Sequence, residues 1–308
     1  MRQLLTAECC VKVMLILLIG VGCPFPAAAS KNEALLDYLT RHIPERPSHS
    51  LTGSQFVDLV SKKDENQREQ VISEQLLKGN LPDFLRQLKP VKLQQQSKSG
   101  QLLRATIFVT PDYLAIGSQA DFIRVPMDYH TARMVATEFG FILPTRRVVD
   151  AIYDQSENHF TPQPLPPGPQ MCSTGYYRRH NQKILQQRYS LGINLGELVS
   201  GHKKDVVITN RLKRKPGRIA IYGWHRPDGK PIQPLSTVHG AGYADYSHGI
   251  RLVSEKVLID GKLYSAYDIL KDPELAPLLS DEGPMADFNS SPQTPALAIN
   301  QHSASGRY

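Results

Sequence analysis

The sequence predicts an α+β fold, in which a helical N-terminal part is followed by a mostly antiparallel sheet with flanking helices. Between residues 30 and 92, apolar residues recur at intervals close to 3.6, the spacing of one helix face. After residue 102 the pattern changes to short alternating segments separated by glycine-containing turns, which is typical of strands. We therefore expect a helical region at 30–98 and an α+β domain at 99–281, between a signal peptide at 1–29 and a disordered tail at 282–308.

The first 29 residues have the three parts of a cleavable signal peptide. Arg2 and Lys12 supply positive charge, an uncharged apolar run occupies 13–22, and three alanines end at Ala29. The run is too short to span a bilayer as a stable helix, and no leucine stands three residues before Cys23, as lipidation would usually require. We expect cleavage after Ala29 and a secreted or periplasmic protein without a transmembrane segment.

The mature chain should be basic and free of internal disulfides. The formal net charge is +7, and removal of the signal peptide, which holds two basic residues and one acidic residue, leaves +6. This excess favours an anionic partner such as cell-wall material or an acidic polymer, whereas nucleic acid fits a secreted protein poorly. Only Cys172 of the four cysteines would remain after cleavage, so stability must come from a hydrophobic core.

Four helices are expected before residue 90. The first carries an apolar stripe at 35–39, and the second follows the capping residue Thr52. The third occupies 67–78 and ends at Gly79, and a short fourth covers 81–88. The polar run at 94–101 is expected to be a linker.

Beyond the linker, turn signals and alternation mark the strands. The expected strands are 102–110, 113–116, 122–126, 205–210 and 218–224, with a hairpin at 257–264 around Asp260-Gly261. The expected helices are 131–139, ended by Gly140, a second from Thr145 to residue 153, a basic one at 176–187, and a last one from Ser265 to about residue 279. Five prolines at 160–169 indicate an extended connector.

The densest group of polar residues lies between Gly201 and Arg251, which contains four of the ten histidines and the only tryptophan. Histidine and aspartate at this density, among glycines that permit close backbone approach, favour proton transfer or metal binding. The alternative is a set of turns whose polar side chains satisfy buried backbone groups. The expected catalytic residues are His202, His239, Asp245 and His248. The expected substrate-binding residues are Lys203, Lys204, Trp224, His225, Tyr243, Tyr246, Ser247 and Arg251. The sequence identifies no cofactor; a divalent metal, if one is bound, would be held by His239, Asp245 and His248.

Two short segments of this region resemble signatures of known enzymes. VHGAGYAD is similar to the SxHxxGxAxD pattern of zinc D-Ala-D-Ala carboxypeptidases, but Asp245 comes one residue early and no HxH follows. SHGIRLVSEKV is similar to the SHGCIRL signature of L,D-transpeptidases, and IAIYG to the strand that precedes it. The nucleophilic cysteine is missing between Gly249 and Ile250, however, and Tyr222 replaces a histidine. Because thioester chemistry needs a thiolate, this second resemblance implies that the transpeptidase activity is absent.

Cys172 offers a third route to catalysis. No cysteine-enzyme motif surrounds it, so the sequence favours an incidental free thiol over a nucleophile, and we expect Cys172→Ser to keep most of any activity. A wider resemblance covers residues 66–283. The segments PDYLAIGS, LPTRRVVDAIY, GHKKDVV, GWHRPDGKPIQP and HGAGYADYSHGIRLV are similar to a family of secreted bacterial proteins without an assigned activity. It implies a bacterial origin and one structural unit, but no catalytic roles.

The first hypothesis is a secreted bacterial hydrolase that acts on cell-wall or other extracellular polymer. His239 or His248 would be the general acid or base, and Asp245 would orient a histidine or act as a base. A polysaccharide lyase is the runner-up, since it needs a tyrosine or histidine base and a cationic group. A non-catalytic envelope or polymer-binding protein, derived from a degenerate enzyme, is the alternative from another class.

Overall fold

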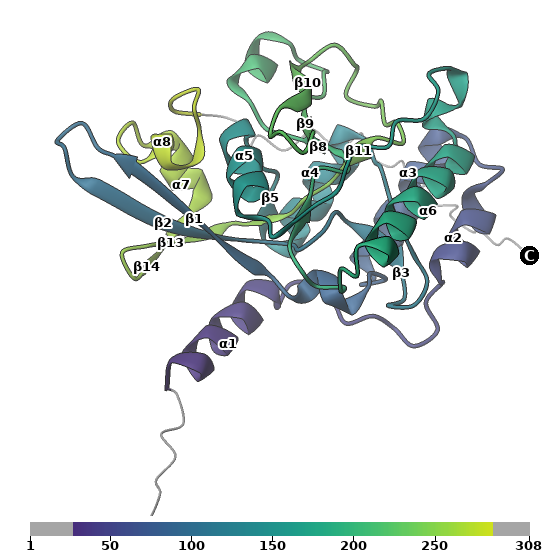
Figure 1. The fold of residues 1–308 in the computed structure, drawn as a ribbon, viewed down its shortest axis with the longest axis horizontal. Helices are drawn as coiled ribbons and strands as arrows, with labels where there is room; N and C mark the ends of the chain where they lie inside the picture. Colours follow the sequence, from purple (N-terminus) through teal and green to yellow (C-terminus); the bar gives the residue numbers. More distant parts are fainter. Residues whose placement is uncertain (1–26, 286–308) are drawn as a thin grey trace, which may run out of the picture.

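The computed structural model describes residues 27–285, with side chains from residue 33 onward. Its fold is α+β, as predicted (Figure 1). The α-helices are α1 (Ala27–Thr40), α2 (Gly53–Val60), α3 (Glu65–Leu77), α4 (Tyr129–Phe139), α5 (Arg146–Gln155), α6 (Thr174–Ser190), α7 (Ala266–Lys271) and α8 (Ala276–Leu279). Short 3₁₀ helices are η1 (Asp83–Arg86), η2 (Pro169–Cys172) and η3 (Asn210–Arg214). The expected signal peptide lies almost entirely outside the described residues, so secretion stays a prediction.

Two larger sheets organise the described part of the chain. The first has the order β14-β13-β2-β12-β5, with β1 paired to β2 beside this path. Its strands are β1 (Lys89–Gln96), β2 (Leu102–Val109), β5 (Phe141–Ile142), β12 (Val253–Ser254), β13 (Lys256–Ile259) and β14 (Lys262–Ser265). The second has the order β10-β9-β8-β11 and consists of β8 (Lys204–Val206), β9 (Ile221–His225), β10 (Pro231–Ser236) and β11 (His248–Gly249).

Two small strand pairs complete the described strands. They are β3 (Ala115–Gly117) with β4 (Phe122–Arg124), and β6 (Asn158–His159) with β7 (Val199–Ser200). Only the β6–β7 and β8–β11 pairs are parallel among the strands that the structure describes, so the sheets are mostly antiparallel, as expected.

Local sequence signals place several elements correctly. The side chain of Thr52 caps α2 and that of Thr145 caps α5, because each accepts a backbone N–H of the first turn. Gly140 ends α4 in the left-handed conformation, at φ 79°. The β13–β14 hairpin turns at Asp260 (φ 46°) and Gly261 (φ 81°), as a two-residue turn with positive φ at both positions requires.

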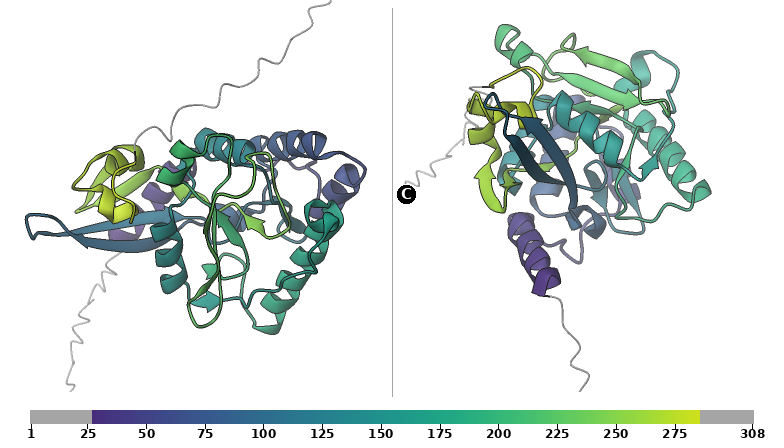
Figure 2. Two further views of the ribbon diagram at one scale, coloured as in Figure 1. Left: turned by 90° about the horizontal axis from the view of Figure 1, so that it is seen from above. Right: turned by 60° about the vertical axis from the view of Figure 1, so that its left-hand side comes forward.

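Three expectations along the chain are wrong. The helix expected at 81–88 is only the 3₁₀ turn η1, and the polar linker expected at 94–101 is instead the end of β1 and a tight turn into β2. The last helix is two short helices, because Pro273 cannot continue the hydrogen bonding of α7. The expected linker therefore belongs to a hairpin that projects from the body of the molecule (Figures 1 and 2).

Residues 282–285, which the sequence predicts to be part of a disordered tail, are ordered. Glu282 accepts hydrogen bonds from Thr209 Oγ1 and the Asn210 N–H, at 2.6 and 3.0 Å. Met285 is buried and its N–H donates to the Leu270 carbonyl. Residues 282–285 are thus part of the fold, and the rest of the expected tail lies outside the described residues.

One large core joins elements from both sides of the boundary expected at residue 98. It contains Val60 of α2, Val91 of β1, Ile107 of β2 and Ile269 of α7. Helix α5 contacts both β1 and β9 and so bridges the two sheets. Among the described residues, no helix has the length and apolarity needed to cross a membrane.

Candidate functional site

Two clusters of polar side chains lie on opposite faces of the small sheet, and strand β8 contributes residues to both. Its partner β11 places His248 beside Lys204 and Gly249 beside Asp205, and its partner β9 places Tyr222 beside Asp205. Paired residues of neighbouring strands point to the same face, and successive residues point to opposite faces. Lys204 and His248 therefore occupy one face of the small sheet, and Asp205 and Tyr222 occupy the other.

Four expected site residues meet on the first face, in a group that we call the Tyr243 cluster: Tyr243, His239, Asp245 and His248, with Cys172 nearby. The Tyr243 ring stacks on His239 at 4.1 Å between ring centroids and meets the His248 ring edge-on at 5.7 Å. The Tyr243 hydroxyl donates to Asp245 Oδ2 at 3.2 Å, and His248 Nε2 lies 3.8 Å from the same oxygen. The cluster is thus held together around one tyrosine.

The inner residues of this cluster are buried and the outer ones are reachable. His248 and Asp245 are fully buried, whereas Tyr243, His239 and Cys172 are half-buried. Ser247 anchors the inner carboxylate, since its N–H donates to Asp245 Oδ1 at 2.7 Å and its hydroxyl donates to the same atom at 2.5 Å. Both ring nitrogens of His248 are buried without a hydrogen-bond partner among the described residues.

Burial and neighbouring charges set the protonation of the cluster. Burial lowers the pKa of His248 to about 4, although Asp245 opposes this shift, so the imidazole is neutral at neutral pH. Burial opposes ionisation of Asp245, but His248, the Ser247 hydrogen bonds and Lys204 outweigh it and hold its pKa below the usual value. Burial and Asp245 raise the pKa of Tyr243, which keeps the phenol protonated. The cluster therefore holds one carboxylate, one neutral imidazole and one phenol.

The three residues expected as metal ligands do not form a metal site. His239, Asp245 and His248 gather around the Tyr243 ring, which contacts both imidazoles. Within residues 27–285, no group of three His, Cys, Asp or Glu side chains is arranged to hold a metal ion. The arrangement suits proton transfer better than metal coordination.

Lys204 and Trp224 flank the Tyr243 cluster on the same side of the sheet. The Lys204 ammonium lies 5.4 Å from the Trp224 ring centroid, and its charge acts on both Asp245 and His248. Trp224 is buried, and its φ of 55° is an outlier for a bulky residue. Such strain persists only where the surroundings enforce it, and it is concentrated at functional sites.

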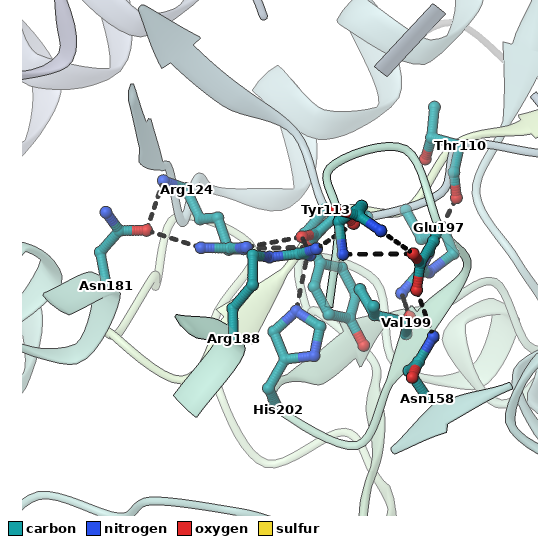
Figure 3. Close-up of polar contacts among 12 residues, drawn as sticks. Thr110, Tyr113, Arg124, Asn158, Asn181, Arg188, Glu197, Val199 and His202 are labelled. Atoms are coloured by element: carbon teal, nitrogen blue, oxygen red, sulfur yellow. Dashed lines mark hydrogen bonds and ion pairs between the residues drawn. The ribbon is translucent and has the colours of Figure 1, made fainter. Parts of the chain in front are cut away.

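His202 lies elsewhere, in a buried ion cluster around Asp112 (Figure 3). Asp112 accepts from Arg124 at 2.6 and 2.9 Å, from Arg188 at 2.9 Å and from His202 Nε2 at 2.9 Å. Burial lowers the pKa of His202 to about 4, against the effect of Asp112. His202 is thus placed away from the other expected catalytic residues, where its imidazole helps to position a buried carboxylate that Arg124 and Arg188 neutralise.

Three residues expected to bind substrate are instead buried structural groups. Arg251 donates to the carbonyls of Thr110 and Val199, at 2.8 and 2.7 Å, and Lys203 Nζ donates to the Tyr246 carbonyl at 2.5 Å. Burial lowers the pKa of Lys203 to about 7. The Tyr246 hydroxyl bonds the backbone of Leu165. All three side chains are buried and bonded to backbone groups, which accounts for their place in the fold.

His225 lies on the opposite face of the small sheet from the Tyr243 cluster. Its Nε2 is 3.1 Å from Asp150 Oδ1, its ring stacks on Tyr153 at 4.5 Å, and Tyr222 donates to the same Asp150 oxygen at 2.8 Å. Burial raises the pKa of nearby Asp205 to about 6. A small cavity on this face is lined by Tyr113, Tyr153, Ser200, Lys203, Asp205, His225 and Arg251, among others.

Sequence reasoning missed the placement of Cys172. It lies near Tyr243 because η2 packs against the 243–246 segment, about 70 residues away along the chain, where the Tyr246 N–H donates to the Met171 carbonyl at 2.9 Å. No local motif signals this proximity.

No protein-family model matches the chain, and no significant match exists among curated proteins or solved structures.

Proposed function

We propose that this protein is a hydrolase that acts outside the cytoplasm on an anionic polymer, with cell-wall material as the first candidate substrate. The observation that carries the proposal is the Tyr243 cluster. One short segment, 239–248, gathers two imidazoles and a carboxylate around one phenol, and the charge of Lys204 acts on His248. These are the groups that acid–base hydrolysis requires.

The burial of each group suggests its role. His239 and Tyr243 are half-buried and so are the groups that can reach a substrate. His239 would activate water, and Tyr243 would donate a proton to the leaving group. Asp245 would orient the phenol and stabilise positive charge on the neighbouring imidazoles, and Lys204 would attract a negatively charged substrate.

A lyase and a binding protein are the two alternatives. A lyase that used Tyr243 as its base would need a phenolate, but burial and Asp245 raise the pKa of this phenol. A lyase at this site would therefore use His239, and not Tyr243, as its base. A non-catalytic polymer-binding protein would use the same lysine and aromatic groups without proton transfer.

The test compares polymer cleavage by the full chain and by Tyr243→Phe. Purified sacculi and polyuronate would be incubated with each protein, and soluble fragments, new ends and unsaturated uronate would be measured. Removal of a general acid costs roughly 100-fold or more in kcat, so Tyr243→Phe should lose almost all cleavage. The matched control is Tyr189→Phe, because Tyr189 is 89 % exposed and far less constrained.

Three results would contradict the hydrolase. No cleavage by the full chain would do so, and so would cleavage that Tyr243→Phe retains. Unsaturated uronate as the product would indicate the lyase. Co-sedimentation with sacculi that needs Lys204 but not Tyr243, without any cleavage, would indicate the binding protein.

A further inference from the structure

We propose that an exposed basic segment next to the Tyr243 cluster binds the polymer, and that this polymer carries repeated carboxylate or phosphate groups. The segment is 211–218, which we call the basic loop. Its basic residues are Arg211, Lys213, Arg214, Lys215 and Arg218. The inference rests on the proposed function, since it takes the Tyr243 cluster as the place where the polymer is cleaved.

The basic loop concentrates the positive charge of the protein. It carries +5, whereas the formal net charge of the whole chain is +7. No Asp or Glu occurs between Asp205 and Asp228 to offset this charge within the segment. All five basic side chains are exposed. The excess charge is therefore gathered on one surface loop, where its field attracts anions, and is not spread over the molecule.

The loop is anchored at one side chain and leaves two others for a ligand. The Arg211 guanidinium donates to the Leu235 carbonyl at 2.9 Å and lies 3.8 Å from Glu282. Thr209 caps the 3₁₀ helix η3 at the start of the loop by accepting the Arg211 N–H. Within residues 27–285, the Arg214 and Lys215 side chains have neither an ion pair nor a hydrogen bond. Their charges are therefore not compensated by the part of the fold that the structure describes.

The C-terminal end of the basic loop is bonded to the segment that carries His239. The Ile219 N–H donates to the His239 carbonyl at 3.2 Å, and the Ala241 N–H donates to the Gly217 carbonyl at 2.8 Å. Arg218 Nη1 donates to the Val238 carbonyl at 2.6 Å. The loop is thus held directly beside the half-buried imidazole that stacks on Tyr243.

The charged residues begin within a short distance of this contact. Lys215 precedes Gly217 by two residues, so their Cα atoms are at most about 7 Å apart. This distance is shorter than the Debye length of about 8 Å at physiological ionic strength, so salt screens the charge only partly over it. Guanidinium and ammonium groups both pair with carboxylate and with phosphate. A polymer that bears either group, and that reaches His239, fits this surface.

The first arm of the test measures binding and needs no cleavage. Polyuronate and poly(glycerol phosphate) are immobilised, and the Kd is measured at low salt for the full chain and for the Arg214→Gln/Lys215→Gln variant. Removal of the two charges should raise the Kd about 10-fold or more. The difference should shrink at high salt, because exposed charges are screened.

Two further variants separate a local effect from net charge. Arg104→Gln/Lys262→Gln removes the same charge from exposed positions on β2 and β14, and should change the Kd by less than about 2-fold. Arg214→Lys/Lys215→Arg keeps the charge in the basic loop and should leave the Kd within about 2-fold of the full chain. Tighter binding to one of the two polymers supports the inference and identifies the charged group.

Four binding results would overturn the inference. They are an unchanged Kd in Arg214→Gln/Lys215→Gln, an equal rise in the Arg104→Gln/Lys262→Gln control, no binding of the full chain to either polymer, and stronger binding to anionic lipid vesicles than to both polymers.

The second arm measures cleavage of the polymer that binds. Because the basic loop does not belong to the reacting groups, Arg214→Gln/Lys215→Gln should raise KM about 10-fold with little change in kcat. An unchanged KM overturns the inference while leaving the hydrolase intact. If the full chain binds the polymer through the basic loop but cleaves nothing, the hydrolase fails and the binding role of the loop stands.

Discussion

At the scale of single residues, Gly249 shows how closely the two clusters are packed across β11. A Cβ atom at this position would lie 2.6 Å from Tyr113 Cδ1 and 2.7 Å from Lys203 Cβ. Both neighbours are fully buried, and Tyr113 is further fixed by its hydrogen bond to Asp205 at 2.8 Å. No side chain fits between them, so glycine is required here by contact and not by backbone conformation.

We expect Gly249→Ala to destabilise the fold by about 2 kcal/mol or more, because overpacking forces buried neighbours out of their positions. The free energy of unfolding would be measured by urea denaturation. Gly242→Ala is the matched control, since a Cβ atom there would have no neighbour within 4 Å and the change should alter stability by less than about 0.5 kcal/mol. Equal stability of Gly249→Ala and the original chain would contradict this packing.

Residue density in the sequence located most of the Tyr243 cluster but not the roles of its neighbours. His239, Tyr243, Asp245 and His248 lie within ten residues, so a local pattern suffices to associate them. Arg251 is different, because its guanidinium bonds the carbonyl of Thr110, which is 141 residues away. Partners so far away in the chain leave no local signal that Arg251 is buried. The sequence around Arg251 alone does not distinguish a buried structural arginine from a substrate-binding one.

At the scale of elements, the sequence predicted the helix caps and tight turns, which depend on neighbouring residues. It did not predict strands whose formation depends on a distant partner strand. The caps at Thr52 and Thr145 and the hairpin at Asp260-Gly261 depend on residues within a few positions. The run at 94–101 consists mostly of polar residues and so resembles a linker. Its first residues nevertheless form part of a strand, because they pair with β2. Strand formation there depends on a partner and not on propensity.

The C-terminal segment at 282–285 illustrates an element fixed by tertiary contacts alone. We expect Met285→Ala to lower the free energy of unfolding by about 2 to 4 kcal/mol, because the Met285 side chain is buried in the large core. Met134→Ala on α4 is the control, since Met134 is 37 % exposed and should cost far less. Denaturation curves of both variants give the comparison, and equal midpoints would mean that 282–285 does not pack on the domain.

At the scale of the whole molecule, buried neutral histidines should make the fold sensitive to acid. His248 has a pKa of about 4 in the folded state, below the usual value near 6.5 of an unfolded chain. Between these values the unfolded state binds the additional proton, so stability falls as the pH falls. His202 contributes in the same direction, whereas Asp205, with its pKa raised to about 6, acts in the opposite one.

The contribution of His248 can be isolated with a variant. Between pH 7 and pH 5 the chain should lose about 2 kcal/mol of stability through this residue, and His248→Gln should lose correspondingly less over the same interval. His130→Gln is the control, because His130 is exposed on α4. Unfolding free energies at the two pH values give the slopes. Identical slopes for His248→Gln and the original chain would show that His248 is not held neutral.

The position of Trp224 makes the intrinsic tryptophan fluorescence of this protein sensitive to ligands that bind near Lys204. Trp224 is the only tryptophan in the sequence, so selective excitation yields the emission of a single indole next to Lys204. A nearby positive charge shifts indole emission, and a bound anion that draws the ammonium away from the ring would change both its wavelength and its intensity. Oligosaccharide or peptide fragments could therefore be titrated against unlabelled protein, and affinity could be read before any turnover assay exists.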